Sequence, residues 1–131
     1  MRRRLATVVM LGAMLPAGAD EAWRQLYVDA AVSVSIDASS LSRREQTWVF
    51  RERELLHAPA LDQASMRRIR EIRYLRQADC AANRLSTLSL AVFSEHGVMV
   101  HYEARQPEAA LWDAPRSSRE VRLLEAVCGP A

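Results

Sequence analysis

The amino-acid sequence predicts an α+β domain in which several antiparallel strands are followed by one C-terminal helix. Apolar and polar residues alternate at period two in several segments before residue 104, which is typical of strands with one buried face. Near the C-terminus this alternation gives way to an apolar stripe with helical spacing. The two cysteines, Cys80 and Cys128, would then join the sheet to the helix through a disulfide.

Alternation and β-favouring residues locate the strands, and turn-forming residues separate them. The predicted strands are residues 23–29, 32–36, 47–55, 85–93 and 98–103. Asp37–Leu41 is predicted as a turn, because aspartate and serine side chains bond nearby backbone N–H groups. Residues 56–64, which contain Pro59, are predicted as a loop. Residues 94–97 are predicted as a hairpin turn.

The segment Met66–Cys80 fits two structures. Apolar residues at every third position over residues 69–75 fit a helix. The alternative is a strand, one face of which would carry Ile72, Tyr74, Ala78 and Cys80. The pattern alone leaves both open.

The last element is predicted as a helix. Ser117 or Ser118 can cap its N-terminus, Glu120 suits its first turn, and Gly129 followed by Pro130 ends it. The predicted apolar stripe consists of Val121, Leu124, Val127 and Cys128.

The first 19 residues have the pattern of a secretory signal peptide. Arg2–Arg4 form a positive region, Leu5–Leu15 form a short apolar region, and Ala17–Ala19 form a cleavage site. The apolar run is shorter than the roughly 20 residues that a membrane helix needs, and no cysteine follows it as in a lipoprotein signal. We therefore expect an exported protein, periplasmic or at the cell surface, with residues 20–131 as its single domain and no transmembrane helix after cleavage.

Export places the cysteines in an oxidising compartment, where an even pair predicts a structural disulfide between Cys80 and Cys128. A redox pair would usually be a close Cys-x-x-Cys, which is absent. Zinc would need four clustered ligands, and His57, His96 and His101 show no ligand spacing. We therefore expect neither a metal nor a cofactor.

The basic residues of the chain are unusual because all 18 are arginines. The absence of lysine excludes chemistry that needs a lysine amine. Three of these arginines lie in the first 19 residues, and the remainder of the chain carries one more acidic than basic residue. A nucleic-acid-binding domain would be strongly basic, so we expect no nucleic acid partner.

A series of short motifs runs along nearly all of the chain after residue 19. These residues are Trp23, Val34–Leu41, Trp48, Asp79–Cys80, Asn83–Arg84, Trp112, Pro115, Ser117 and Val127–Cys128. In this order they resemble the surface-adhesin protein E family of Gram-negative envelope proteins.

The resemblance implies an antiparallel sheet of about six strands, with the C-terminal helix tethered to one face by the disulfide. It favours a strand for Met66–Cys80, and it implies a non-enzymatic binding module, because the best-known members are adhesins for host matrix and serum proteins. The chain departs from the family in two ways: it lacks the lipidation cysteine of those adhesins, and Ile36 stands where an aromatic residue is frequent. The first departure favours a periplasmic protein.

Five neighbouring arginines are the candidate binding residues for an acidic partner. They are Arg67, Arg68, Arg70, Arg73 and Arg76. Guanidinium groups suit lipopolysaccharide phosphates, a sulfated glycan or an acidic protein patch. The alternative is a solvated face whose arginine stems cover apolar surface. Open sheet edges would also allow a homodimer.

Other residues carry weaker alternatives. An enzyme or enzyme accessory protein would use Asp37, His57 or His101, although Ser39 and Ser40 beside Asp37 suit turn chemistry better than a nucleophile. A small-ligand carrier would have an apolar pocket between helix and sheet. The tryptophans, Trp23, Trp48 and Trp112, are expected to pack between sheet and helix rather than anchor a partner.

Overall fold

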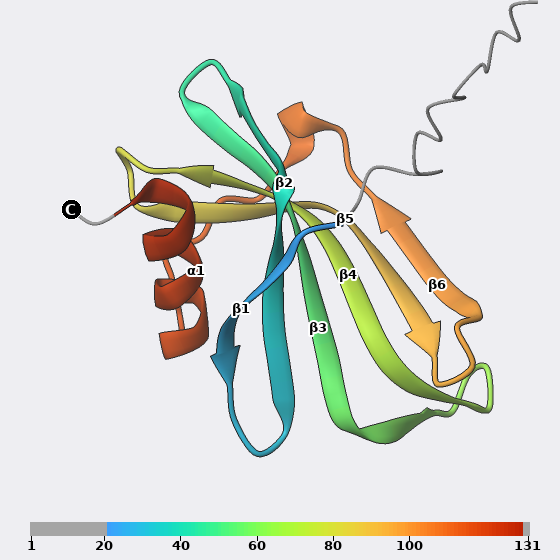
Figure 1. Ribbon diagram of the computed structural model, residues 1–131. Coiled ribbons are helices and arrows are strands. Elements are labelled where there is room, and N and C mark those ends of the chain that lie inside the picture. Colours follow the sequence, from blue (N-terminus) through green and yellow to red (C-terminus); the bar gives the residue numbers. More distant parts are fainter. Residues whose placement is uncertain (1–20, 130–131) are drawn as a thin grey trace, which may run out of the picture.

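Six strands form one antiparallel sheet, in which each strand pairs with its neighbours in sequence (Figure 1). The computed structural model describes residues 21–129, so the expected signal peptide lies outside the described residues. The strands are β1 (Trp23–Val28), β2 (Val32–Arg44), β3 (Thr47–Asp62), β4 (Arg67–Asp79), β5 (Arg84–Ser94) and β6 (Met99–Ala104). A 3-10 turn (Pro107–Ala109) and the helix α1 (Ser118–Cys128) follow. The predicted α+β architecture is confirmed, and β1 and β6 form the edges of the sheet.

The segment that fits both a helix and a strand is strand β4. It pairs with β3 without interruption from Thr47↔Asp79 to Leu55↔Glu71, and it pairs with β5 on its other edge. A central strand satisfies its backbone hydrogen bonds on both sides, so tertiary pairing decides what the local pattern left open.

Two predicted interruptions are wrong. Residues 56–62 are not a loop: β3 continues to Asp62, and its pairing with β4 only slips between Leu55 and Ala60. Pro59 lies within this register shift, where regular pairing is interrupted, so its missing N–H removes no hydrogen bond between the two strands. Asp37–Leu41 is not a turn either, because β2 runs through it while the pairing with β3 shifts between Asp37 and Ser42.

The core lies between α1 and one face of the sheet. Leu123, Leu124 and Val127 of the helix pack against sheet residues. The sheet residues of this cluster are Ile36, Phe50, Ala78 and Leu85. The expected stripe is thus partly wrong, because Val121 is 42% exposed and Leu123 takes its place.

The helix ends are fixed as the sequence predicts. The Ser117 hydroxyl accepts a hydrogen bond from the Glu120 N–H at 3.2 Å, and Gly129, with φ of 80°, follows the last turn. Cys80, directly after β4, is bonded to Cys128 with the two Cα atoms 5.6 Å apart, so the expected tether is confirmed. Among residues 21–129, no helix has the length and apolar character needed to cross a membrane.

Candidate binding surface and hollow

The turns of two hairpins meet at one end of the sheet and carry cationic and apolar side chains together. The Glu95 N–H in the β5–β6 turn donates to the Arg68 carbonyl at 2.8 Å, which holds this turn against β4 (Figure 1). Arg68 lies opposite Leu61 in the β3–β4 pairing. We call this region the cationic tip, and it consists of Leu61, Met66, Arg67, Arg68, Arg70 and Val98.

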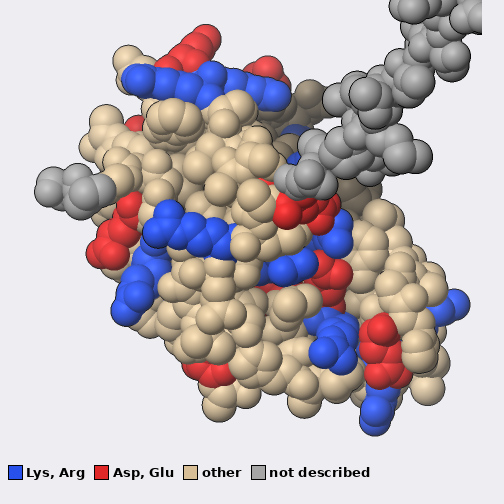
Figure 2. Space-filling view, viewed as in Figure 1, with Lys and Arg blue, Asp and Glu red and all other residues tan. Residues whose placement is uncertain are grey.

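The three arginines of the cationic tip are exposed, and none has an ion-pair partner within residues 21–129. The nearby acids are Asp62 and Glu95. Hydrogen bonds from the Ser65 hydroxyl and N–H lower the pKa of Asp62, so that it remains ionised. Even so, the three cations outnumber the two acids. Figure 2 shows blue side chains beside red ones at the corresponding lower right end of the molecule.

Arg73 and Arg76 lie away from this tip. They are three residues apart on β4, where its pairing with β3 is uninterrupted, so their side chains point to opposite faces. Arg73 Nε lies 3.0 Å from Glu71 Oε1, and Arg73 Nη1 lies 3.5 Å from Glu21 Oε1. The first three of the five candidate arginines therefore lie exposed at the beginning of β4 without an ion pair in the described chain, whereas Arg73 and Arg76 are held in ion pairs.

Arg76 joins three elements beneath the helix. Its Nη1 lies 3.1 Å from Oε2 of Glu52 on β3, and its Nη2 lies 3.8 Å from Oε2 of Glu120 in the first turn of α1. Glu52 is only 3% exposed. Burial raises the pKa of Glu52, and the charge of Arg76 opposes this effect without reversing it. The Arg76–Glu52 pair is therefore a buried structural contact.

A second polar contact lies beside this pair. Glu54 accepts a hydrogen bond from the Tyr74 hydroxyl at 3.3 Å and pairs with Arg119 Nη1 at 3.2 Å. Burial, followed by the charges of Glu54 and Glu52, raises the pKa of Tyr74, which therefore stays neutral. The N-terminal half of α1 thus lies on a polar area of the sheet, and its C-terminal half lies on the apolar core.

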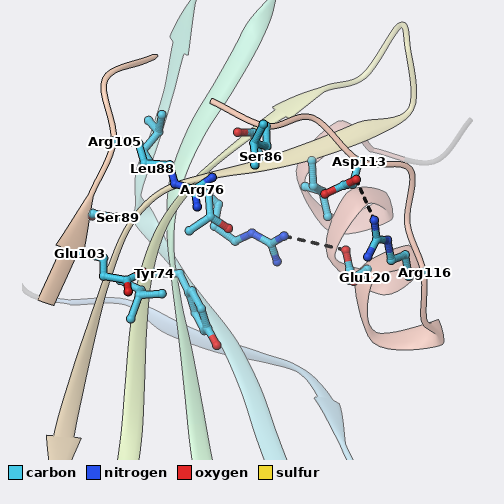
Figure 3. A pocket seen from close by; sticks show the side chains of 14 residues that line it. Tyr74, Arg76, Ser86, Leu88, Ser89, Glu103, Arg105, Asp113, Arg116 and Glu120 are labelled. Atoms are coloured by element: carbon cyan, nitrogen blue, oxygen red, sulfur yellow. Dashed lines mark hydrogen bonds and ion pairs between the residues drawn. The ribbon is translucent and has the colours of Figure 1, made fainter. Parts of the chain in front are cut away.

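An open hollow of about 290 Å³ lies between β4–β6 and the segment that leads into α1. Figure 3 shows Arg76 reaching across it towards Glu120, with Glu103 and Arg105 on one side and Asp113 and Arg116 on the other. Its apolar lining is Leu85, Leu88, Leu90 and Leu111. Three arginines and three acidic residues line the hollow. It therefore presents both hydrogen-bond donors and hydrogen-bond acceptors to a small polar molecule, and the charges of its lining cancel.

The tryptophans only partly follow the expectation of core packing. Trp48 packs against the core. Trp23 instead stacks with Arg53, whose guanidinium carbon lies 4.4 Å from the ring centroid, and Trp112 stacks with Arg84 at 4.8 Å. These cation–π contacts attach the start of β1 and the segment before α1 to the sheet.

The candidate enzymatic groups have separate hydrogen-bond partners. His57 Nε2 lies 2.7 Å from the Ser33 hydroxyl, and His101 Nε2 lies 2.9 Å from Glu103 Oε1. Asp37 accepts hydrogen bonds from the backbone of Ala22 and from Ser39. Each group therefore has a local structural role, and no contact joins the three within the described chain.

Asp37 also provides a test of stability against pH. Burial raises its pKa, but the hydrogen bonds from the Ser39 hydroxyl and the Ala22 and Ser39 N–H groups outweigh burial and lower the pKa overall. A lowered carboxyl pKa contributes stability that is complete above the ordinary value of 3.8 and is lost as the pH falls below it.

We therefore expect Asp37→Asn to be less stable than the unmodified protein at pH 7, with a difference that shrinks below pH 3.8. Urea unfolding at pH 7 and at a pH below 3.8 measures the difference in stability. Glu125→Gln, at an exposed position of the helix, is the control. A difference that stays constant over this range would contradict the assignment.

The apolar part of the cationic tip and the residues that line the hollow are not evident from the sequence. Leu61 and Met66 flank the predicted arginines, but their exposure follows only from the sharp hairpin that joins β3 to β4. The one indication in the sequence is Met66, an apolar residue that stands directly before Arg67 and Arg68. The hollow combines residues from β4 to α1 that have no common sequence pattern.

Comparisons with known proteins agree with this architecture. Crystal form II of Haemophilus influenzae protein E is similar, with a TM-score of 0.60 and 15% identity over 86% of this chain and 91% of that chain. The selenomethionine form of Haemophilus influenzae protein E has a TM-score of 0.58 and 13% identity over 86% and 90%. No curated protein matches in sequence. The family model for surface-adhesin protein E matches residues 23–129, which include every strand and the tethered helix, and the chain therefore belongs to that family.

Proposed function

We propose that the protein is an exported, non-enzymatic interaction module of the cell envelope that binds an acidic partner through the cationic tip. The observation that carries this proposal is the group Arg67, Arg68 and Arg70, three exposed guanidinium groups without ion pairs in the described chain. Membership of a family of surface adhesins supports an adhesin-like surface protein.

Guanidinium groups are suited to this role. Each presents a planar fork of donors that binds a phosphate, sulfate or carboxylate in bidentate fashion. Partners of this chemistry are a lipopolysaccharide, a sulfated glycan or an acidic patch on a host protein. A shallow, exposed surface suits such extended partners better than a small substrate.

The proposed location follows from two features. The signal-peptide pattern of residues 1–19 supports export, and the disulfide between Cys80 and Cys128 suits an oxidising compartment. We place the protein in the periplasm or at the cell surface, where acidic glycans and lipid phosphates are accessible.

Replacement of Arg67, Arg68 and Arg70 together by serine tests this function. We expect the variant to elute from a heparin column at much lower salt than the unmodified protein, because three of its charge-assisted contacts are lost. The control is Arg24→Ser with Arg44→Ser and Arg122→Ser, which removes the same charge from exposed positions on β1, β2 and α1. Unchanged retention of the tip variant, or an equal loss in the control, would refute the proposal.

A second candidate function is carriage of a small neutral, hydroxyl-rich ligand in the hollow beside α1. Ser86, which lines the hollow, is 2% exposed, and its hydroxyl has no hydrogen-bond partner within the described residues. The balanced charges of the lining favour a neutral ligand over an ion. We expect neutral sugars to raise the unfolding temperature and Leu90→Trp, which fills the hollow, to abolish that increase. A protein that no neutral sugar stabilises would exclude this function.

A further inference from the structure

We infer that the cationic tip docks on an anionic lipid surface, with its arginines on the lipid phosphates and its apolar side chains among the acyl chains. This inference rests on the proposed function and names the partner of the same surface. It differs from binding of a soluble polyanion because it assigns a role to the apolar residues of the tip.

The apolar side chains are the first argument. Met66 is 71% exposed and Leu61 is 56% exposed, and Val98 in the neighbouring turn is 41% exposed. Clustered exposure of large apolar side chains at one point usually marks an interaction surface. A sulfated glycan would leave these side chains in water, whereas a lipid surface removes them from water while it neutralises the cations.

The arrangement of charge is the second argument. Arg67 follows Met66 directly in the chain, and Arg68 lies opposite Leu61 in the β3–β4 pairing. Leu61 and Met66 therefore each have an arginine as a neighbour, one across the strand pair and one along the chain. An arginine side chain can extend its guanidinium group to the phosphate layer while its aliphatic part lies against the acyl chains. The arginines can therefore contact phosphates at the same insertion depth at which the apolar side chains contact acyl chains.

The tip is also preorganised. Asp62 accepts hydrogen bonds from the Ser65 N–H at 3.0 Å and the Ser65 hydroxyl, which closes the β3–β4 turn. The hydrogen bond between Glu95 and Arg68 holds the second turn in place. Binding therefore requires little ordering of the backbone, which lowers its entropic cost.

The β2–β3 hairpin provides a contrast within the same molecule. It also carries two exposed arginines, Arg43 and Arg44, but its large apolar residue, Trp48, packs against the core. Residues 42–48 present no large exposed apolar side chain. The combination of unpaired cations and exposed apolar groups thus distinguishes the β3–β4 hairpin from the β2–β3 hairpin.

Co-sedimentation with lipid vesicles tests the inference. We expect the unmodified protein to bind vesicles of phosphatidylglycerol mixed with phosphatidylcholine and not vesicles of phosphatidylcholine alone. Serine in place of Arg67, Arg68 and Arg70 should weaken binding on the order of 100-fold, since each cation contributes about fivefold. Serine in place of Leu61 and Met66 should weaken it about tenfold.

The control is again the triple variant at Arg24, Arg44 and Arg122, which should retain vesicle binding. Urea midpoints verify that each variant is folded. Failure to bind anionic vesicles, with arginine-dependent heparin retention intact, would overturn the lipid inference alone and favour a soluble polyanion or acidic protein. Loss of arginine dependence in both assays would refute the proposed function as well. Vesicle binding that is unchanged in the Leu61 and Met66 variant would exclude insertion.

Discussion

Simultaneous replacement of Cys80 and Cys128 by serine is expected to lower the free energy of unfolding by about 4 kcal/mol. The two cysteines are 48 residues apart in sequence, and a crosslink over a loop of this length removes much of the entropy of the unfolded chain. The loss is a large part of the 5–15 kcal/mol that stabilises a typical domain, roughly a quarter or more. The bond also fixes the last residue of α1 to the end of β4.

Urea unfolding followed by tryptophan fluorescence measures this loss. The unmodified protein in a strong reductant is the matched control and should fall to the same stability as the variant. Amide hydrogen exchange in α1 should accelerate more than exchange in β3 and β4, because the helix loses its tether while the central strands keep both neighbours. A loss well below 1 kcal/mol would contradict a structural role for the disulfide.

The second large effect is expected for Arg76→Met, which should lower the free energy of unfolding by about 3–5 kcal/mol at neutral pH. Arg76 is the cation that lies 3.1 Å from the buried carboxylate of Glu52. Removal of one partner of a buried ion pair leaves the other charge without compensation, and this costs far more than an exposed ion pair contributes. Arg116→Met, which breaks an exposed pair with Asp113, is the control and should have little effect.

The cost of Arg76→Met should depend on pH in a defined direction. Burial raises the pKa of Glu52, and loss of the opposing Arg76 charge raises it further. A carboxyl with a raised pKa stabilises the folded state fully below its ordinary value of 4.5 and loses that stability as the pH rises through the folded pKa. The variant should therefore be most destabilised at pH 7 and recover towards pH 4.5.

A double variant separates this explanation from simple loss of packing. Glu52→Gln combined with Arg76→Met removes both charges, so it should recover most of the stability at pH 7 and lose the pH dependence above pH 4.5. Urea unfolding of the unmodified protein, the single variants Glu52→Gln and Arg76→Met, and the double variant at pH 7 and at about pH 4 completes the cycle. Equal destabilisation by Arg76→Met at both pH values would exclude an uncompensated Glu52 charge as the cause.

Part of the fold follows from local chemistry alone. The alternation in Leu85–Phe93 and Val98–Glu103 locates the last hairpin, and Ser117 marks the start of the helix. The interruptions could not be predicted in the same way. Asp37 and Pro59 are typical of turns and loops, but they also occur at irregularities of strand pairing, and their own sequence does not distinguish the two.

The candidate site depends still more on tertiary structure. Arg73 and Arg76 lie close in sequence to the tip arginines, but strand alternation sends them to opposite faces of β4, where carboxylates from other segments pair with them. The partner of Arg76 lies 24 residues earlier in sequence, at a position fixed only by the β3–β4 register. Neighbouring positions in sequence therefore did not predict a common surface.

The sequence by itself determined the α+β class, the two cysteines available for the tether, and the cap that begins the helix, because each depends on residue type, spacing or short-range hydrogen bonds. Only the tertiary structure decided that Met66–Cys80 is a strand and that three of its arginines remain unpaired beside exposed apolar side chains. Strand pairing and side-chain burial depend on residues distant in sequence, and local patterns carry little information about them.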